Sequence, residues 1–454
     1  MNYDLMIIGA GPGGYHAAYT AAEYGMKTAL IEEREAGGTC LNRGCIPTKT
    51  WIHTADLLRE MRHAELFGLE NMNPSVSREG MIKRKEDVVS SLRKGLEDSF
   101  RAKKIDYING KATVIDASHV RVNGEIYETG KILIASGSLP ALPPIEGIDN
   151  EGVITSDDIL EKLPETDRLI VIGGGVIGSE IAGIYAELGT KVVILEAMDQ
   201  LLPNMDSEIA RNLALIYKKR GIEIHTSAFV KKIEKEAAGL TVSYSEKGKD
   251  GSVSGGLVLV CTGRKANIRD LFEKDMPETE RGRLRIDENY MTSADGIYAI
   301  GDAVSGYPQL AHTASAMGEN AVRRMNGKPA LRNLAYIPAC VYTSPEIASA
   351  GLSEKEAKEK GYEVVTGKGL MHANARTKIA EGERGFVKLV ADKNTGKLLG
   401  ASLMCERATD MIMELVYAMI DEKTPEQLLE AVHPHPSFAE GIETAYRTLN
   451  EKLH

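Results

Sequence analysis

Near its amino terminus the chain reads Asp4-Leu5-Met6-Ile7-Ile8-Gly9-Ala10-Gly11-Pro12-Gly13-Gly14. The apolar run predicts a short buried strand, and the periodicity after the glycines predicts a helix that ends near Tyr24. A second strand is expected over residues 27–31, with Glu32 at its end. Such glycines let the backbone approach a pyrophosphate at a helix amino terminus, and Glu32 can accept hydrogen bonds from a ribose diol. A lone glycine triplet often marks only a tight turn, but strand, helix and acid in register predict a dinucleotide-binding fold.

The same pattern occurs a second time. Residues 168–172 predict a strand, Gly173-Gly174-Gly175-Val176-Ile177-Gly178 follows, and the next strand ends at Glu196. The last glycine precedes the acid by the same number of residues in both copies, so two accidental matches are improbable. The chain is therefore predicted to bind two dinucleotides, or two parts of one redox pair. Because no Arg or Lys stands near Glu196, its carboxylate would repel a 2′-phosphate, and the second site is predicted to favour NAD over NADP.

Two of the five cysteines lie in the stretch Gly37-Gly38-Thr39-Cys40-Leu41-Asn42-Arg43-Gly44-Cys45-Ile46-Pro47-Thr48-Lys49. In a straight α-helix they would be about 7.5 Å apart along the axis, and a disulfide needs Cα atoms within roughly 7 Å. A bridge here therefore requires a distorted backbone, which Gly44 permits. Pro47 suits the first turn of a helix and would place Cys45 just before it, where the dipole favours a thiolate.

Two other interpretations of this pair stay open. The cysteines could be small buried hydrophobic residues, or half of a zinc site, although zinc ligand pairs are usually closer in sequence and no second cluster completes one. The remaining cysteines, Cys261, Cys340 and Cys405, are scattered singly, as expected in a reducing cytosol. A disulfide in that compartment would be catalytic rather than structural.

The composition limits the class of protein. A chain of 454 residues is too long for one core, so two to four domains are expected. The net charge is −10 without a basic block, which argues against nucleic acid or an anionic membrane as partner. The first residues have no basic segment and the apolar run breaks at Gly9, so we expect no signal peptide, no transmembrane helix and a cytoplasmic location.

Later segments add candidate site residues. Residues 139–145 hold three prolines and read as a connection between domains, and Asp302 follows a strand predicted over residues 297–300. An acid at the carboxyl end of such a strand points toward a ligand, but it could equally be a helix N-cap. From Leu331 onward, strands and helices alternate as in a separate α+β domain, which ends with His433-Pro434-His435-Pro436-Ser437-Phe438-Ala439-Glu440. That loop could be a surface turn, a metal-binding pair, or a base with its orienting carboxylate.

Taken together, these residues resemble the pyridine nucleotide–disulfide oxidoreductase family over the whole chain. The resemblance implies an α/β, glutathione-reductase-like fold with two Rossmann-like dinucleotide-binding domains and a C-terminal α+β dimerisation domain. Its implied domains are an FAD-binding domain (1–144), an NAD-binding domain (145–266), a central domain that completes the FAD site (267–331) and a C-terminal interface domain (332–454).

The resemblance also implies roles. Cys40 would be the interchange thiol, Cys45 the charge-transfer thiolate against the flavin, and His435 the base with Glu440 as its partner; of the two histidines in the loop, the resemblance favours His435 over His433. Lys49 would lie near flavin N5, paired with Glu180. The implied FAD contacts are Gly9, Gly11, Gly14, Glu32, Lys49, Gly110, Ser136, Gly137, Ser138, Asp302, Gln309, Leu310, Ala311 and His312. The implied NAD contacts are Gly173, Gly175, Gly178, Glu180, Glu196 and Gly263; no metal site is expected.

The implied activity is the oxidation of a protein-bound dihydrolipoyl dithiol through the disulfide and FAD, with NAD⁺ as acceptor. The implied partners are a second copy of the chain and a lipoyl-bearing protein of a 2-oxoacid dehydrogenase or glycine cleavage complex. One alternative is a glutathione- or mercuric-reductase-like enzyme, although Glu196 opposes NADPH and the last residues hold no cysteine pair. Another is a protein that serves mainly as a binding subunit of a multienzyme complex.

Overall fold

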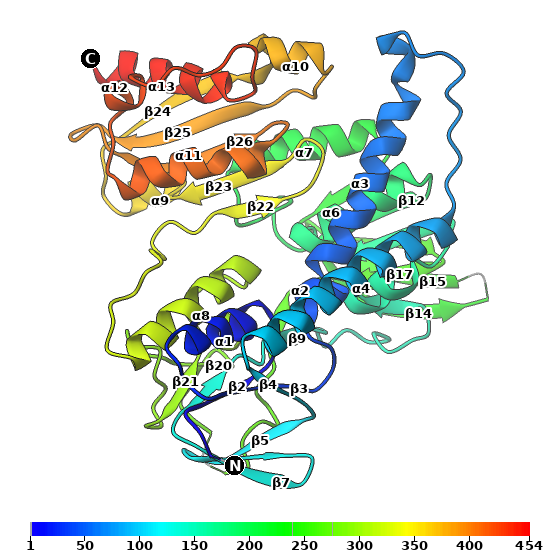
Figure 1. The fold of residues 1–454 in the computed structure, drawn as a ribbon. Coiled ribbons are helices and arrows are strands. Elements are labelled where there is room, and N and C mark those ends of the chain that lie inside the picture. Colours follow the sequence, from blue (N-terminus) through cyan, green and yellow to red (C-terminus); the bar gives the residue numbers. More distant parts are fainter. Residues whose placement is uncertain (1, 238, 275) are drawn as a thin grey trace.

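The computed structural model describes residues 2–237, 239–274 and 276–454. Its amino-terminal half is built around a parallel sheet in the order β21-β8-β2-β3-β4. The strands are β2 (Leu5–Ile8), β3 (Thr28–Glu32), β4 (Asp106–Asn109), β8 (Ile132–Ile134) and β21 (Ile297–Ala299). Helices α1 (Pro12–Glu23) and α8 (Ala311–Met325) lie side by side against it (Figure 1). Because β21 comes after the residues that form a second sheet, described below, the chain returns to this first sheet late in its sequence.

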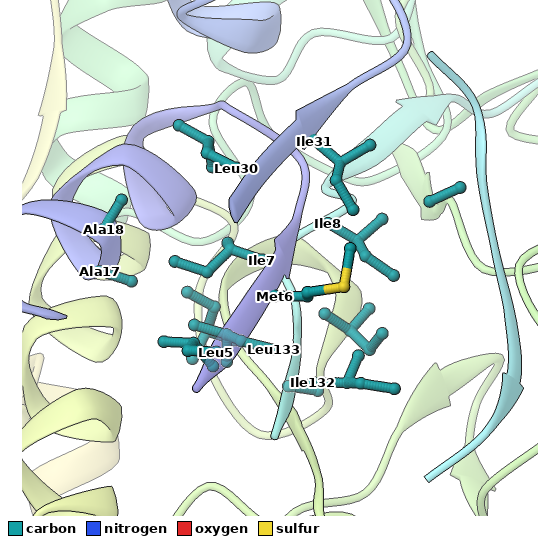
Figure 2. Packing of buried hydrophobic residues seen from close by; sticks show 14 of the residues in the cluster. Leu5, Met6, Ile7, Ile8, Ala17, Ala18, Leu30, Ile31, Ile132 and Leu133 are labelled. Carbon is teal, nitrogen blue, oxygen red and sulfur yellow. The ribbon is translucent and has the colours of Figure 1, made fainter. Parts of the chain in front are cut away.

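The core of this first unit follows from continuous apolar strands. A parallel sheet is covered on both faces, so its strands carry apolar residues without alternation. Figure 2 shows Met6, Ile7 and Leu133 at the centre of the sheet, with Ala17 and Ala18 of α1 packed against it. All five are fully buried.

A second parallel sheet has the order β10-β17-β11-β12-β13. Its strands are β10 (Val153–Thr155), β11 (Arg168–Ile172), β12 (Lys191–Glu196), β13 (Glu223–Thr226) and β17 (Leu257–Val260), with helices α5 (Ser156–Lys162), α6 (Val176–Glu187) and α7 (Ser207–Lys219). Each glycine-rich stretch therefore lies between a strand and the helix that follows it, β2 and α1 in the first sheet and β11 and α6 in the second, as predicted.

Each of these two units also carries strands outside its parallel sheet, and these strands pair mostly antiparallel. In the first unit these are β5 (Ala112–Asp116), β6 (His119–Val122) and β7 (Glu125–Thr129), with β1 (Asn2–Tyr3) alongside β7; in the second they are β14 (Ala228–Glu236), β15 (Gly239–Glu246) and β16 (Lys249–Gly255). Between the units, β9 (Ser138–Pro140) pairs with β18 (Arg264–Ala266), so the proline-rich connection has a strand partner. The short remaining strands are β19 (Thr279–Glu280) and β20 (Arg283–Leu284).

The C-terminal residues form a third unit around an antiparallel sheet in the order β22-β23-β26-β25-β24. The strands are β22 (Ala339–Val341), β23 (Ile347–Gly351), β24 (Val364–Leu370), β25 (Phe386–Asp392) and β26 (Leu398–Met404). Helices α11 (Ala408–Ile420) and α13 (Glu440–Leu453) share one buried cluster with this sheet, and smaller helical segments are α9 (Glu354–Glu359), η3 (Met371–Ala373), α10 (Ala375–Ile379) and α12 (Pro425–Leu428). The α+β prediction for this region is confirmed.

Two long helices connect the three units. Helix α3 (Cys45–Arg62) leaves the short helix α2 (Gly38–Arg43) and packs against α6, and α4 (Arg78–Ala102) returns beside it after η1 (Ala64–Phe67) (Figure 1). Trp51 of α3 is buried in one cluster with Ile181 of α6 and with Phe386 of the third unit. In the described ranges of the chain, no helix is both long and apolar enough to cross a membrane.

Candidate active site

The two glycine-rich loops have nearly the same geometry. Gly9 and Gly173 adopt φ values of 108° and 106°, where an added Cβ would lie 2.3 Å from the Ala135 carbonyl oxygen and 2.5 Å from that of Cys261. Only glycine fits these two positions, because the neighbouring strand passes so close. In contrast, a Cβ at Gly175 would meet no atom within 4 Å. Each loop thus packs tightly at its start, and the second loop leaves open space beside its helix amino terminus.

The acids at the strand ends are bound to these loops. Glu32 accepts the Ala10 N–H at 2.8 Å with one oxygen and the Arg34 N–H at 3.0 Å with the other. Glu196 repeats the arrangement, accepting the Gly174 N–H at 2.6 Å and the Met198 N–H at 2.7 Å. Each carboxylate oxygen has a second lone pair, so both acids can still accept hydrogen bonds from a ribose. Both sites therefore fit a dinucleotide of the kind predicted.

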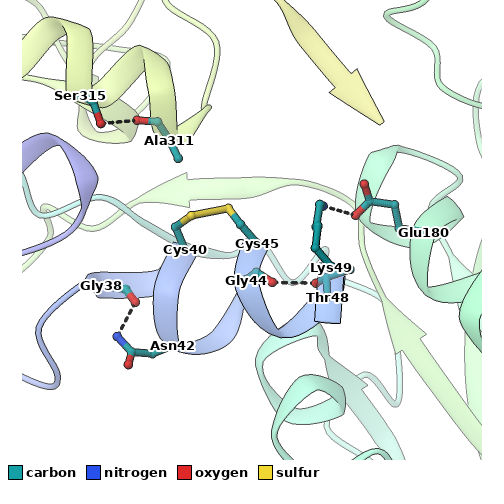
Figure 3. Close-up of a disulfide and its surroundings, with 10 residues drawn as sticks. All are labelled: Gly38, Cys40, Asn42, Gly44, Cys45, Thr48, Lys49, Glu180, Ala311 and Ser315. Carbon is teal, nitrogen blue, oxygen red and sulfur yellow. Dashed lines mark hydrogen bonds and ion pairs between the residues drawn. A yellow bond between two sulfur atoms is a disulfide. The ribbon is translucent and has the colours of Figure 1, made fainter. Parts of the chain in front are cut away.

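The two cysteines are joined across the junction of α2 and α3. Their Cα atoms are 4.7 Å apart, which is possible because the helix breaks at Gly44, with φ −143° and ψ −110° (Figure 3). The required backbone distortion therefore lies where the sequence predicted it. Helix α3 begins at Cys45 itself rather than after it, so Cys45 lies in the first turn, near the free N–H groups that favour a thiolate.

The other three cysteines have different surroundings. Burial raises the pKa of Cys261 to about 12 and that of Cys340 to about 11. Burial likewise raises the pKa of Cys405 far above its ordinary value. These thiols stay protonated and are poor nucleophiles, so the thiol chemistry of the described residues is concentrated at Cys40 and Cys45.

One turn into α3, Lys49 reaches across to the second unit. Its Nζ lies 2.6 Å from Oε2 of Glu180 on α6 (Figure 3). The other oxygen of Glu180 accepts the Tyr342 N–H at 2.9 Å. The Lys49 ammonium also lies 4.7 Å from the centre of the Tyr342 ring, within the range of a cation–π contact. Glu180 is only 4% exposed, so this ion pair holds the lysine beside the disulfide. Residues from all three units meet here.

Ser138, at the start of β9, and Asp302, shortly after β21, come together. Asp302 accepts the Ser138 hydroxyl at 2.5 Å, and Ser138 Oγ in turn accepts a hydrogen bond from Arg264 Nε at 2.8 Å. Asp302 does not cap α8, whose N-cap residue is Leu310, so the ligand role is the better supported of the two alternatives. Nearby, the Ser136 hydroxyl is buried without a hydrogen-bond partner among the described residues. An orphaned hydroxyl of this kind fits a polar group of a bound cofactor.

The remaining predicted cofactor residues occupy two further places. Gln309 to His312 form the entry to α8, where Gln309 donates weakly to the Asp302 carbonyl and His312 Nε2 lies 2.7 Å from the Pro338 carbonyl. Gly110 follows β4, and an added Cβ there would collide with Asn123. Gly137 and Gly263 both have positive φ and open space around the missing side chain.

His435 and Glu440 form a pair at the start of α13. His435 Nδ1 lies 2.8 Å from Glu440 Oε1, while Glu440 Oε2 accepts the Ser437 N–H at 2.8 Å. The Ser437 N–H and then the His435 ring hold the pKa of Glu440 below its usual range. An ionised Glu440 keeps the proton on Nδ1 of a neutral His435 and leaves Nε2 free to accept one.

A single chain does not bring this pair to the disulfide. Figure 1 places α13 on the C-terminal sheet, far from α2 and the start of α3. Cys40, Cys45, Lys49 and the first glycine loop lie together, whereas His435 lies in another part of the molecule. The sequence did not predict the contacts of Tyr342 with Lys49 and Glu180, nor those of His433 with two glutamates, Glu414 and Glu443. No local sequence signal reports a contact between distant elements.

Comparison with known proteins agrees with this geometry. Residues 3–318 match the family described as pyridine nucleotide-disulphide oxidoreductase, and residues 337–446 match the dimerisation domain of that family. The chain belongs to the pyridine nucleotide-disulphide oxidoreductase family. Its dimerisation domain supports assembly as a homodimer.

Individual relatives cover nearly the whole chain. A dihydrolipoyl dehydrogenase of Bacillus subtilis is 37% identical, over 100% of this chain and 99% of its own length. The crystal structure of LpdA from Mycobacterium tuberculosis has a TM-score of 0.89 at 27% identity, covering 98% of this chain and 99% of its own. The HOCl-induced flavoprotein disulfide reductase RclA from Escherichia coli, as a Cu(II) complex, has a TM-score of 0.88 at 29% identity, with the same coverage.

Proposed function

We propose that the chain is an FAD-dependent dihydrolipoyl dehydrogenase, which oxidises a protein-bound dihydrolipoyl dithiol and reduces NAD⁺ to NADH. The observation that carries this proposal is the Cys40–Cys45 bridge at the start of α3, beside the Lys49–Glu180 pair and the first glycine loop. Full-length relatives named dihydrolipoyl dehydrogenase support the substrate class.

The cofactors follow from the two loops. The first loop, Glu32, Ser136 and Asp302 would hold FAD, and the second loop with Glu196 would hold NAD. When bound, the two cofactors supply the electron acceptors that return the enzyme dithiol to the disulfide. Lys49 follows the first loop in sequence and Glu180 follows the second, and their ion pair joins α3 to α6, so it would orient both sides of the redox centre.

The thiol chemistry follows from the helix break. A substrate thiolate attacks Cys40 Sγ, the bond between the two enzyme sulfurs breaks, and Cys45 leaves as a thiolate. The first turn of α3 stabilises that leaving thiolate, which is why we assign the attacked sulfur to Cys40. The second substrate thiol then displaces Cys40, so that the substrate leaves as a disulfide and the chain holds a dithiol. Two electrons and the protons of two thiols have been transferred from the substrate.

The base must take up one of those protons. His435 Nε2 is available because Glu440 engages Nδ1, so His435 accepts the proton of the attacking thiol and becomes an imidazolium next to a carboxylate. Since α13 lies far from α2 in one chain, we propose that the His435 and Glu440 of one subunit serve the disulfide of the other. The lipoyl-bearing partner and a cytoplasmic location stay predictions.

A steady-state assay tests the proposal. Purified protein should carry FAD and should reduce NAD⁺ with dihydrolipoamide far faster than it reduces glutathione disulfide with NADPH. RclA, a disulfide reductase of the same fold, gives the second candidate, a reductase of another disulfide. Turnover of a disulfide with NADPH, together with no turnover of dihydrolipoamide, would replace the first candidate by the second.

A further inference from the structure

We propose that His433 is a positioning residue, whose buried ring anchors the segment that carries the base His435 to helices α11 and α13. The inference rests on the proposed role of His435 as the base, and it assigns a function to the other histidine of the loop. The segment meant here is residues 432–437.

The His433 side chain is buried between two carboxylates. Its ring is 7% exposed, with Nε2 3.2 Å from Glu414 Oε1 on α11 and Nδ1 3.5 Å from Glu443 Oε2 on α13. The neighbours on both sides point outward, since Val432 is 95% exposed and the His435 side chain is 71% exposed. His433 is therefore the inward-facing side chain of an otherwise exposed stretch.

The main chain of this segment has few other attachments. Within the part of the chain that the structure describes, the backbone of residues 432–436 makes no hydrogen bond. Its two ends are held: the Ala431 N–H just before it donates to the Leu428 carbonyl at 3.3 Å, and at its end Ser437 donates to Glu440 and accepts from the Asn374 amide at 2.8 Å. A loop held only at its ends keeps conformational freedom unless a side chain anchors the middle, and His433 is positioned to do so.

The two carboxylates that receive the ring are themselves fixed. Glu414 Oε1 also accepts the Tyr446 hydroxyl at 3.0 Å, and Glu443 pairs with Arg447 at 2.6 Å. Burial raises the pKa of Tyr446 far above its usual value, so this hydroxyl stays a donor. The hydrogen bond of the ring runs from Nε2 to Glu414, whereas Nδ1 faces Glu443 without a hydrogen bond to it. His433 is therefore anchored by one hydrogen bond to a carboxylate and by the burial of its ring.

The His433 anchor and the Glu440 contact have different effects on His435. Glu440 fixes the proton position on His435, because it engages Nδ1. His433 touches neither His435 nor the disulfide in this structure, but it sets where the segment leaves the protein surface. Removing the anchor should therefore leave the His435–Glu440 pair formed and place it less often where a substrate thiol can reach it.

The test compares His433→Leu with His433→Gln in the full-length holoenzyme. Leucine removes the hydrogen bond to Glu414, whereas the glutamine amide keeps an N–H donor for that carboxylate. We expect His433→Leu to lower kcat for dihydrolipoamide oxidation by about tenfold at unchanged KM, less than the roughly 10²–10⁴-fold that a base contributes, because the base is displaced and not removed. His433→Gln should keep most of the activity. Glu414→Gln, which retains an acceptor for Tyr446 and loses only the charge, should fall between them.

A second reaction separates positioning from general damage. Oxidation of NADH by ferricyanide uses the cofactors but no thiol base, so every variant should keep the wild-type rate. The matched control is His225→Leu, because His225 lies between Glu223 and Glu246, both at 2.8 Å, on the edge strand β13. It should leave dithiol turnover unchanged.

Each failure has its own signature. Wild-type kcat in His433→Leu, or a parallel loss of the ferricyanide reaction in it, would overturn the anchor. Loss in His433→Gln equal to that in His433→Leu would do the same, since it would mean that the hydrogen bond to Glu414 is not what holds the segment. If wild-type protein oxidises NADH with ferricyanide but never turns over the dithiol, the proposed function fails instead.

Discussion

Mixed dimers offer a quantitative test of the shared active site. Cys45→Ser removes the disulfide of one chain and His435→Gln removes its base, so each homodimer should be nearly inactive. In a mixed dimer, one site combines the intact disulfide of the second chain with the intact base of the first, and the other site lacks both. The separation of α13 from α2 within one chain is the structural reason to expect this pairing (Figure 1).

The magnitude follows from twofold symmetry. Equal co-expression gives about half of all dimers as mixed dimers, each with one working site of two, so about a quarter of wild-type dithiol turnover should return. A base and disulfide in the same chain would give essentially no activity, because every site would carry one lesion.

A reciprocal mixture sharpens the test. Here the doubly substituted Cys45→Ser/His435→Gln chain is mixed with wild-type chain in equal amounts. With a shared site, both sites of a mixed dimer are damaged, and only wild-type homodimers contribute, about a quarter of full activity. With a site inside one chain, each mixed dimer keeps one good site, and the total rises to about half. Activity near zero in the first mixture and near one half of the wild-type value in the second, with mixed dimers shown to be present by differential tags, would refute the shared site.

Three other perturbations test separate parts of the molecule. Glu196→Arg should weaken NAD use and improve NADP use in steady-state kinetics, since it replaces the carboxylate at the second loop by a cation; equal use of NADH and NADPH by the wild type would contradict this assignment. Cys45→Ser should keep bound FAD but lose dithiol turnover and the long-wavelength charge-transfer band seen on partial reduction; an intact band would move the thiolate role to Cys40. Hydrogen bonds from Lys358 and then Lys388 lower the pKa of Glu354 to about 2. The stabilisation of the folded protein by this carboxylate is therefore complete above its unfolded-state pKa near 4.5, and it is lost as the pH falls toward 2. Because Glu354 is one-third exposed, we expect roughly 1 kcal/mol or less, seen as a smaller acid-induced fall in melting temperature for Glu354→Gln than for wild type.

The parts of the site that could be predicted are those written in local sequence. The glycine loops are set by backbone geometry within a few residues, and Gly44 between the cysteines marks the helix break that the bridge needs. Strand polarity also led to the prediction that Asp302 faces a ligand; this stays a prediction, and the structure shows the hydrogen bond of Asp302 with Ser138. These features depend on neighbours in sequence or on the general rules of parallel sheets.

The parts that could not be predicted depend on contacts between distant elements. Lys49 and Glu180 are far apart in sequence, and only the family resemblance paired them. The Tyr342 ring over Lys49 and the two acids around His433 depend on how the C-terminal sheet packs against α3 and how α11 packs against α13. The sequence did not predict strands β14 to β16 either, because their exposed faces are polar and their sequence lacks a continuous apolar run.

The two dinucleotide loops are nearly identical locally, so their surroundings must explain why only one adjoins a disulfide. In the first loop, the Ala10 carbonyl accepts the Gly37 N–H at 2.9 Å, and a Cβ on Gly38 would lie 2.7 Å from the Gly11 Cα. Helix α2, which carries Cys40, is thus placed directly against the loop that would cradle FAD. In the second loop, the equivalent carbonyl oxygen, that of Gly174, accepts the Leu202 N–H at 2.9 Å from the segment between β12 and α7. The same backbone motif therefore contacts the helix that carries the disulfide in one copy and a segment without cysteine in the other. A larger residue at Gly38 should push α2 away from the first loop and impair dithiol oxidation, while NAD binding at the second loop is preserved.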